Sequence, residues 1–250
     1  MTPVLDVVIL TWNDPPAMLA SAIESVLQSG VDVKVFVVDN GSQPAARPDT
    51  VDERVQLVRS PRNLGVSVGR TVGVMLGSAA SVAFLDSDAR LGSGALRQLL
   101  DIALDRGVGV VGPAYVGQDP DESGGRAPTL RTKVARALNR RSTYEPPANG
   151  VVTGGIRSVD FVIGACQVFR REVWDAVHGL DTAIFYGPED IDFCLRVAAA
   201  GYDVVQHLEA EVHHPPRRAA RNLLSRRGLR HAVAVGRHLW RHRKGRSPSP

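Results

Sequence analysis

Cysteine is scarce in this sequence, with only Cys166 and Cys194 among 250 residues. A domain held together by disulfides uses several cysteines, and zinc sites built from cysteine use closely spaced pairs. The sequence fits neither class. We expect two reduced, partly buried thiols, and a disulfide between them is the less favoured alternative.

Long hydrophobic runs are also missing. No stretch approaches the roughly 18 consecutive apolar residues that a membrane-spanning helix requires. Asp6 interrupts the first apolar run, which argues against a secretory leader and favours a buried strand. We therefore expect a cytoplasmic protein.

Acidic residues are absent from the last part of the chain. Residues 217–250 contain 11 Lys and Arg and no Asp or Glu, whereas residues 1–216 contain 26 acidic and 19 basic side chains. This asymmetry predicts an acidic body and a basic tail that seeks an anionic surface.

The tail also has helical periodicity. Apolar residues recur at helical spacing from Leu229 to Trp240, with Arg and His between them. We predict a basic amphipathic helix that holds the protein peripherally at the inner face of the cell membrane. Packing of this helix on the domain is an alternative, and we do not expect a nucleic-acid contact.

The body alternates between apolar runs and segments with helical spacing. Strands are expected at residues 4–10, 33–38, 54–58, 82–85, 108–111, 159–169, 204–205 and 209–212. Helices are expected at residues 17–28, 93–105, 172–177 and 188–200, and at the end of a glycine-rich stretch, 63–77. Asp14 is a candidate N-cap for the first helix. This alternation predicts an α/β fold with a mostly parallel sheet.

We divide the body into two halves of one domain, residues 1–115 and 159–214. Residues 117–158 are polar and rich in glycine and proline, which predicts a variable segment with a short basic helix near 129–141. The proposed domain covers residues 1–216, and residues 217–250 form the tail.

Polar clusters follow three of the expected strands. They are Thr11-Trp12-Asn13, Asp39-Asn40-Gly41-Ser42 and Asp86-Ser87-Asp88. Ligands of such sheets bind at the carboxyl ends of the strands, so three clusters at one edge indicate a site. Asp86 and Asp88 can both approach one hard cation such as Mg²⁺ or Mn²⁺. A solvated turn that caps the next helix is the alternative for this pair.

Other polar residues are open to two interpretations. Asp39 could accept a hydrogen bond from a pyrimidine base or only close an Asx-turn. Arg62, Asn63, Gly65 and Arg70 could bind phosphate or nucleoside oxygens, or form a surface loop.

Two further groups lie later in the chain. Acids at the start of the helix at 188–200 could interact with its dipole, or one could act as a general base. His213-His214 could complete a metal shell or be an exposed pair.

The motifs together resemble the family 2 glycosyltransferases, an inverting family with the GT-A fold, over residues 4–214. The segments that carry the resemblance are VVILTWN, VVDNGS, RNLGVSVGR, FLDSD, GACQVFRREVW, GLD and YGPEDIDFCLR, in that order. The subgroup it most resembles is the bacterial rhamnosyltransferase-like one. Two positions depart from the family pattern: Gln43-Pro44 replaces a common Thr-Asp, and Thr71 replaces a common Asn.

The resemblance implies a Rossmann-like sheet flanked by helices and a role for each matching residue. The nucleoside would contact Thr11, Asn13 and Asp39, and the nucleotide pocket would be lined by Arg62, Asn63, Gly65 and Arg70. Asp86 would contact the ribose or the metal, and Asp88 would be the main ligand of Mg²⁺ or Mn²⁺. Asp190 would be the catalytic base, Glu189 would bind the acceptor, and His213, which matches better than His214, would approach the metal or the diphosphate.

The implied reaction transfers a sugar, rhamnose or another hexose, from a nucleoside-diphosphate donor to a hydroxyl of a glycan or polyprenyl-linked acceptor. Such a reaction serves cell-wall or polysaccharide synthesis. Two alternatives are a sugar-phosphate nucleotidyltransferase and a non-catalytic nucleotide-sugar-binding protein. The first would show a basic, glycine-rich stretch after the first strand, where this chain has Thr11-Trp12-Asn13-Asp14.

Overall fold

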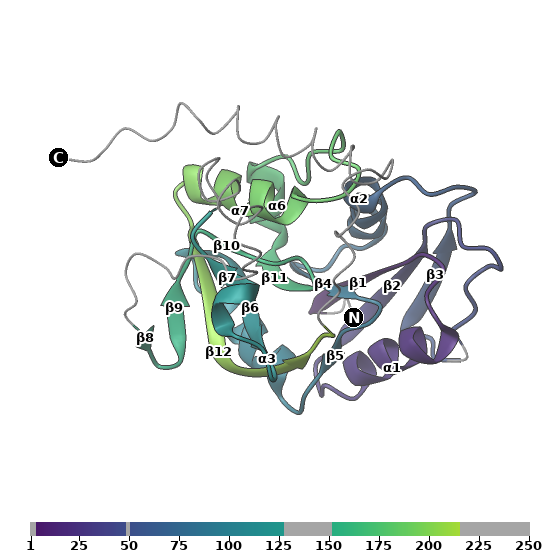
Figure 1. The fold of residues 1–250 in the computed structure, drawn as a ribbon, viewed down its shortest axis with the longest axis horizontal. Coiled ribbons are helices and arrows are strands. Elements are labelled where there is room, and N and C mark those ends of the chain that lie inside the picture. Colours follow the sequence, from purple (N-terminus) through teal and green to yellow (C-terminus); the bar gives the residue numbers. More distant parts are fainter. Residues whose placement is uncertain (1–3, 49–50, 128–151, 216–250) are drawn as a thin grey trace, which may run out of the picture.

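The computed structural model describes residues 4–48, 51–127 and 152–215. The helix expected near residues 129–141 and the basic tail at 217–250 lie outside this part of the chain. The described residues form a large central sheet with helices on both faces (Figure 1), as expected for an α/β fold.

The central sheet has ten strands in the order β3-β2-β1-β4-β11-β6-β12-β9-β8, with β5 paired to β12. Its strands are β1 (Leu5–Thr11), β2 (Val33–Asp39), β3 (Val55–Arg59), β4 (Ser81–Asp86), β5 (Arg90–Leu91), β6 (Val108–Tyr115), β8 (Val152–Thr153), β9 (Ile156–Ser158), β11 (Cys166–Arg170) and β12 (Asp203–His213). A second, two-stranded sheet pairs β7 (Gly124–Gly125) with β10 (Phe161–Val162).

The helices are α1 (Pro16–Leu27), α2 (Val66–Leu76), α3 (Ala95–Ala103), α4 (Pro120–Ser123), α6 (Arg171–Ala176) and α7 (Glu189–Ala199). Helix α1 begins without a side-chain cap, and the residue at its N-cap position is Pro15. The prediction that Asp14 caps this helix is therefore wrong, because its carboxylate is engaged elsewhere, as described below.

The central sheet is mostly parallel in its longer strand pairs and also contains antiparallel pairs. Strands β3, β2, β1 and β4 are parallel neighbours, as are β6 and β12. Strand β11 runs antiparallel to β4 and β6, between which it lies. The expected strand at 159–169 is divided into β10 and β11, and the two short strands expected at 204–212 form the single strand β12.

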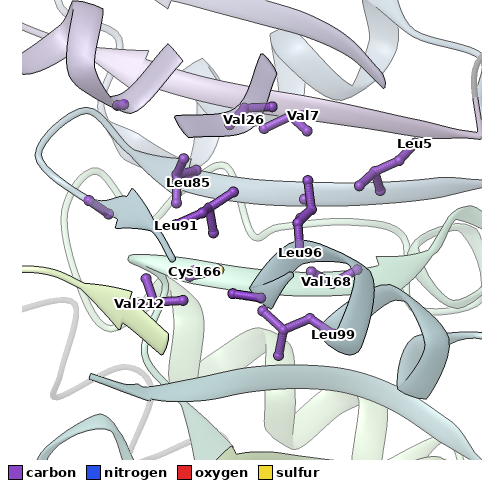
Figure 2. Close-up of a cluster of buried hydrophobic side chains, with 14 of the residues drawn as sticks. Leu5, Val7, Val26, Leu85, Leu91, Leu96, Leu99, Cys166, Val168 and Val212 are labelled. Atoms are coloured by element: carbon purple, nitrogen blue, oxygen red, sulfur yellow. The ribbon is translucent and has the colours of Figure 1, made fainter. Parts of the chain in front are cut away.

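Each face of the sheet is covered by its own hydrophobic cluster. Along β1, Leu5, Val7 and Ile9 point to the face covered by α1 and α3, and Val8 points to the opposite face. This alternation follows from the two-residue period of a strand. Figure 2 shows part of the first cluster, in which Val7 lies near Val26.

An aromatic group fixes α6 and α7 on the opposite face. The Phe169 ring stacks on Trp174 at 5.8 Å and meets the edges of Phe84 at 5.1 Å and Phe193 at 5.2 Å. Such pairs add about 0.5–1.5 kcal/mol each beyond area burial. They hold the N-terminus of α7, where two of the candidate site residues lie, at a fixed place over the sheet.

The register of the parallel strands aligns three polar strand ends. Thr11 pairs with Asp39, and Leu10 pairs with Asp86. The carboxyl ends of β1, β2 and β4 therefore meet at one edge, as predicted. Elsewhere, Cys166 and Cys194 are free and buried. Among the described residues, no helix has both the length and the apolar content needed to cross a membrane.

Gly65, directly before α2, offers a test of how closely the two halves of the fold approach each other. Its φ is +86°, and an added Cβ would lie 2.5 Å from the Phe185 carbonyl oxygen. We expect Gly65→Ala to lower the free energy of unfolding by more than the roughly 1–3 kcal/mol that such a backbone conformation alone costs a non-glycine residue. Gly30→Ala is the control for a positive φ without a close neighbour, because Gly30 has φ +70° and open space around it. Urea unfolding of both variants measures the difference, and equal losses would contradict the close approach.

Candidate active site

A cluster of three possible metal ligands lies at this edge of the sheet. The ligand atoms of Asp86, Asp88 and His214 are all within 4.8 Å of one another. His214 Nε2 is 3.4 Å from Asp88 Oδ1 and 3.9 Å from Asp86 Oδ2. The Asp88 side chain is 1% exposed and that of Asp86 is 36% exposed, so the cluster opens toward solvent on one side. Two carboxylates and one imidazole are a donor set that suits Mn²⁺.

His214 takes the place that the sequence suggested for His213. His213 is the last residue of β12, is exposed, and pairs with Arg90 of β5. The His214 ring lies 5.2 Å from that of Tyr115 and faces the two acids. His214 follows the end of β12, and its side chain is the one of the pair that lies against the two acids. The candidate metal site is therefore Asp86, Asp88 and His214.

Arg70 lies inside the protein between acidic groups. Its Nη2 donates to Asp86 Oδ1 and to the Gly164 carbonyl, both at 2.7 Å, and its Nη1 is 3.7 Å from Glu189 Oε1. The residue is 4% exposed. Burial alone would lower the pKa of Arg70, but the charges of Asp86, Glu189 and Asp190 outweigh burial and raise it. Arg70 thus joins the metal cluster to α7 and does not present an open surface to a nucleotide.

Glu189 and Asp190 open α7 with different surroundings. Asp190 is partly exposed and accepts hydrogen bonds from the Gly164 amide at 3.0 Å and the Ile191 amide at 2.8 Å. Glu189 is 7% exposed and faces Arg70. Burial and the neighbouring Asp190 charge raise the pKa of Glu189 to about 7, whereas Arg70 lowers it. Of the two acids, Asp190 is the one that a substrate can approach.

The raised pKa of Glu189 has a consequence for stability. The unfolded chain releases the Glu189 proton at the ordinary pKa of 4.5, whereas the folded protein keeps it up to a pKa of about 7, so stability falls as pH rises through this window. The side chain introduced by Glu189→Gln cannot ionise. We therefore expect the free energy of unfolding of this variant, relative to that of the parent, to rise by on the order of 1–3 kcal/mol when the pH is raised from about 5 to about 8. Urea unfolding at both pH values measures this gain, and Asp101→Asn on the exposed face of α3 is the control. A gain that is equal at both pH values would contradict the assignment.

The turn after β2 is closed by Asp39. Its Oδ1 accepts from the Ser42 amide at 2.8 Å, its Oδ2 accepts from the Ala46 amide at 3.0 Å, and Arg59 Nε lies 3.5 Å away. The Asp39 side chain is 1% exposed. The geometry therefore contains the Asx-turn, and a base would have to share an oxygen that already accepts an amide hydrogen. Arg59, which the sequence reading did not single out, is half exposed beside this carboxylate.

Asn13 extends the same arrangement toward the first strand. Its φ is +58°, its amide donates to Ser42 Oγ at 2.9 Å, and its Oδ1 accepts from the Gln43 amide at 2.7 Å. Thr11 is buried and donates through Oγ1 to Asp14 at 3.1 Å. Thr11 and Asn13 were both expected to contact the nucleoside, and of these two only Asn13 is exposed.

The glycine loop before α2 is held by Asn40, which belongs to the polar cluster after β2. Asn40 Nδ2 donates to Asn63 Oδ1 and to the Gly65 carbonyl, both at 3.2 Å, and Asn40 Oδ1 accepts from the Leu64 amide at 2.9 Å. Arg62 is exposed beside this loop. Asn40 thus joins the two loops in which the sequence placed the nucleotide contacts.

Comparison with known proteins identifies the family. The profile of the glycosyltransferase-like family 2 matches residues 3–233. The chain belongs to this family. The predicted family is confirmed.

Curated relatives of this family 2 chain include an N-acetylglucosaminyl-diphospho-decaprenol L-rhamnosyltransferase of Mycobacterium tuberculosis. The two are 28% identical over 92% of this chain and 82% of the relative. A pre-mycofactocin glycosyltransferase of the same organism is also 28% identical, over 84% of this chain and 43% of the relative. An uncharacterized protein of Sinorhizobium fredii is 28% identical over 85% of this chain and 24% of the relative. The family 2 chain thus spans less than half the length of two of these relatives.

Solved structures show the same fold. A mannosyltransferase of Pyrobaculum calidifontis in complex with GDP-Man and Mn²⁺ has a TM-score of 0.67 at 15% identity, over 99% of this chain and 66% of that one. GalNAc-T7 with UDP, GalNAc and Mn²⁺ has a TM-score of 0.71 at 16% identity, over 97% of this chain and 50% of that one. The predicted GT-A fold of the family 2 chain is therefore confirmed.

Proposed function

We propose that this chain is an inverting, metal-dependent glycosyltransferase that moves a sugar from a nucleoside diphosphate to an acceptor hydroxyl. The observation that carries the proposal is that the buried guanidinium of Arg70 contacts two separate groups of acidic residues. Arg70 contacts Asp86 of the metal cluster on one side and Glu189, next to Asp190, on the other. A diphosphate held at the first group and a hydroxyl held at the second would be neighbours.

Asp86, Asp88 and His214 would hold a Mn²⁺ or Mg²⁺ ion, and this ion would supply positive charge that neutralises the departing diphosphate. The donor set supports this assignment, since carboxylates suit both ions and the imidazole favours Mn²⁺. The mannosyltransferase and GalNAc-T7 structures, both solved with Mn²⁺, support the same choice.

Asp190 is the proposed catalytic base. It accepts two amide hydrogen bonds, which hold its carboxylate in one orientation, and it remains partly exposed. The proton of the acceptor hydroxyl passes to Asp190 as the hydroxyl oxygen bonds to the anomeric carbon of the sugar. The bond from that carbon to the diphosphate oxygen breaks on the opposite side, so the anomeric configuration inverts.

Glu189 has a supporting part in this scheme. Its carboxylate lies in the interior against Arg70, so we assign it to fixing Arg70 and the start of α7. The acceptor contact first expected of Glu189 would require it to turn away from Arg70. The nucleoside would lie over the loops that carry Asn13, Asp39 and Arg62.

The donor and acceptor are proposed from the relatives. The rhamnosyltransferase of Mycobacterium tuberculosis, named for a lipid-linked acceptor, supports rhamnose or another hexose as the sugar and a polyprenyl-linked glycan as the acceptor. Transfer of the sugar to a polyprenyl-linked acceptor would require the protein to bind at the inner face of the membrane. Removal of residues 217–250 would then reduce binding to anionic liposomes, and unchanged binding would remove the tail from the proposal.

A panel of nucleotide-sugars tests the function. Purified protein is mixed with UDP-, GDP- and dTDP-sugars and Mn²⁺, and release of the nucleoside diphosphate is measured with and without a polyprenyl-linked acceptor. We expect one donor to be consumed faster with the acceptor present. Binding of a donor without turnover on any acceptor would favour a binding protein instead.

A further inference from the structure

The middle residue of the metal loop, Asp86-Ser87-Asp88, is tied to a distant carboxylate. Ser87 is 3% exposed, and its Oγ donates to Asp14 Oδ2 at 2.5 Å. Asp14 lies between β1 and α1, 73 residues earlier in the chain. The bond therefore joins two of the strand ends that form the site.

We propose that Asp14 is a positioning residue for the metal loop: through Ser87 it fixes the loop so that Asp86, Asp88 and His214 converge on one cation. This inference rests on the metal site of the proposed function and adds a residue to it. Asp14 is not one of the three candidate ligands, so its proposed effect on the cation is indirect.

The Asp14 carboxylate is not used as a helix cap. Helix α1 has no side-chain cap hydrogen bond, although an acid before a helix commonly supplies one. The same Oδ2 instead accepts from Thr11 Oγ1 at 3.1 Å and from the Trp12 amide at 3.2 Å. These two bonds fix the carboxylate on its own loop, and the fixed oxygen then receives the Ser87 hydroxyl.

The rest of the metal loop is held at its ends. The Asp86 amide donates to the Ala165 carbonyl at 2.9 Å, and the Ala89 amide donates to the Asp86 carbonyl at 3.0 Å. Arg70 holds the Asp86 carboxylate. Asp14 adds a side-chain contact to the residue between the two acids. Partners of this kind orient metal ligands, and their loss typically weakens metal affinity by about 10- to 100-fold.

The same loop also reaches the nucleoside side of the site. The Asn13 amide donates to Ser42 Oγ at 2.9 Å, and the Ser42 amide donates to Asp39 Oδ1 at 2.8 Å. Asp14 and its neighbour thus connect the turn after β2 to the metal loop. If a nucleotide strengthens cation binding through this connection, the cation strengthens nucleotide binding by the same factor.

Direct Mn²⁺ binding tests the inference without reliance on turnover. Free Mn²⁺ is titrated by electron paramagnetic resonance against the full chain and against Ser87→Ala, Ser87→Thr, Asp14→Ala and the double variant Asp14→Ala/Ser87→Ala, each with and without UDP or GDP. We expect Ser87→Ala to weaken Mn²⁺ binding by about 10- to 100-fold. Ser87→Thr keeps the hydroxyl and should stay near the parent. The double variant should bind no more weakly than Ser87→Ala, because Asp14 acts through that hydroxyl.

The outcomes separate this inference from the proposed function. Mn²⁺ binding by the parent that Ser87→Ala leaves unchanged, or fully additive losses in the double variant, would overturn the role of Asp14 and leave the metal site standing. A parent that binds no Mn²⁺, alone or with nucleotide, would overturn the metal site and this inference with it. If Ser87→Ala does not fold, the comparison of Asp14→Ala with Ser87→Thr decides, and equal Mn²⁺ affinities of the two contradict the inference.

Discussion

Replacing Asp190 by Asn is expected to reduce the rate of sugar transfer by about 10²- to 10⁴-fold, the usual contribution of a general base. Asn has nearly the same shape and can still accept one of the two amide hydrogen bonds that Asp190 receives. It cannot take the proton of the acceptor hydroxyl. The loss should appear in kcat, with donor affinity little changed, because Asp190 lies on α7 and outside the metal cluster.

Steady-state kinetics with saturating donor and acceptor measure this change. Asp101→Asn, on the exposed face of α3, is the matched control and should behave as the parent. The melting temperature should show that Asp190→Asn is folded. A near-normal rate of transfer by Asp190→Asn would contradict the assignment of Asp190 as the base. Its buried neighbour Glu189 would then be the next candidate.

Replacing Asp88 by Ala is expected to weaken binding of the divalent cation severely. Its side chain is 1% exposed and faces His214, so the substitution removes a buried ligand and water is a poor substitute for its charge. We expect Mn²⁺ affinity to fall by more than the roughly 10- to 100-fold that follows loss of a group that only orients a ligand. Transfer should fall with it, and added Mn²⁺ should not fully restore the rate.

The two neighbouring histidines supply the control for the metal cluster. His214→Ala should also weaken Mn²⁺ binding, whereas the exposed His213→Ala should change it by no more than about twofold, the range of ordinary surface substitutions. Isothermal titration with Mn²⁺ measures both. A larger loss from His213→Ala than from His214→Ala would contradict the cluster.

The edge of the site followed from local rules. Apolar runs ending in Thr11, Asp39 and Asp86 predicted parallel strands, and parallel strands place their carboxyl ends together. The pairing of Thr11 with Asp39 and of Leu10 with Asp86 agrees with that prediction. The antiparallel direction of β11, which lies between β4 and β6, could not be predicted, because a short apolar run does not indicate the direction of a strand in a sheet.

The choice between His213 and His214 as metal ligand depends on an irregularity of β12 that the alternation of residues along the sequence does not reveal. The pairing of β12 with β6 shifts in register between His207 and Val212. Such a bulge changes which residues face a given side of a strand, so counting along the sequence cannot decide which histidine faces Asp88.

Arg70 and Asp14 make contacts that the sequence did not predict, for a related reason. A charged residue near a glycine loop is ordinarily exposed, and an acid before a helix is ordinarily its cap. Arg70 is buried because Asp86 and Glu189, distant in the chain, surround it. Asp14 is turned from its helix because Ser87 is within reach. Both roles depend on contacts that only the folded chain creates.

The most direct test of the account is the fate of the anomeric carbon in a reaction with the donor found by the panel. Parent protein, Mn²⁺, the nucleotide-sugar and a polyprenyl-linked acceptor are combined, and the product linkage is determined by NMR before and after EDTA is added. The account predicts a product with inverted anomeric configuration and no further product once EDTA removes the cation. A product with retained configuration, or transfer that continues undiminished in EDTA, would contradict it.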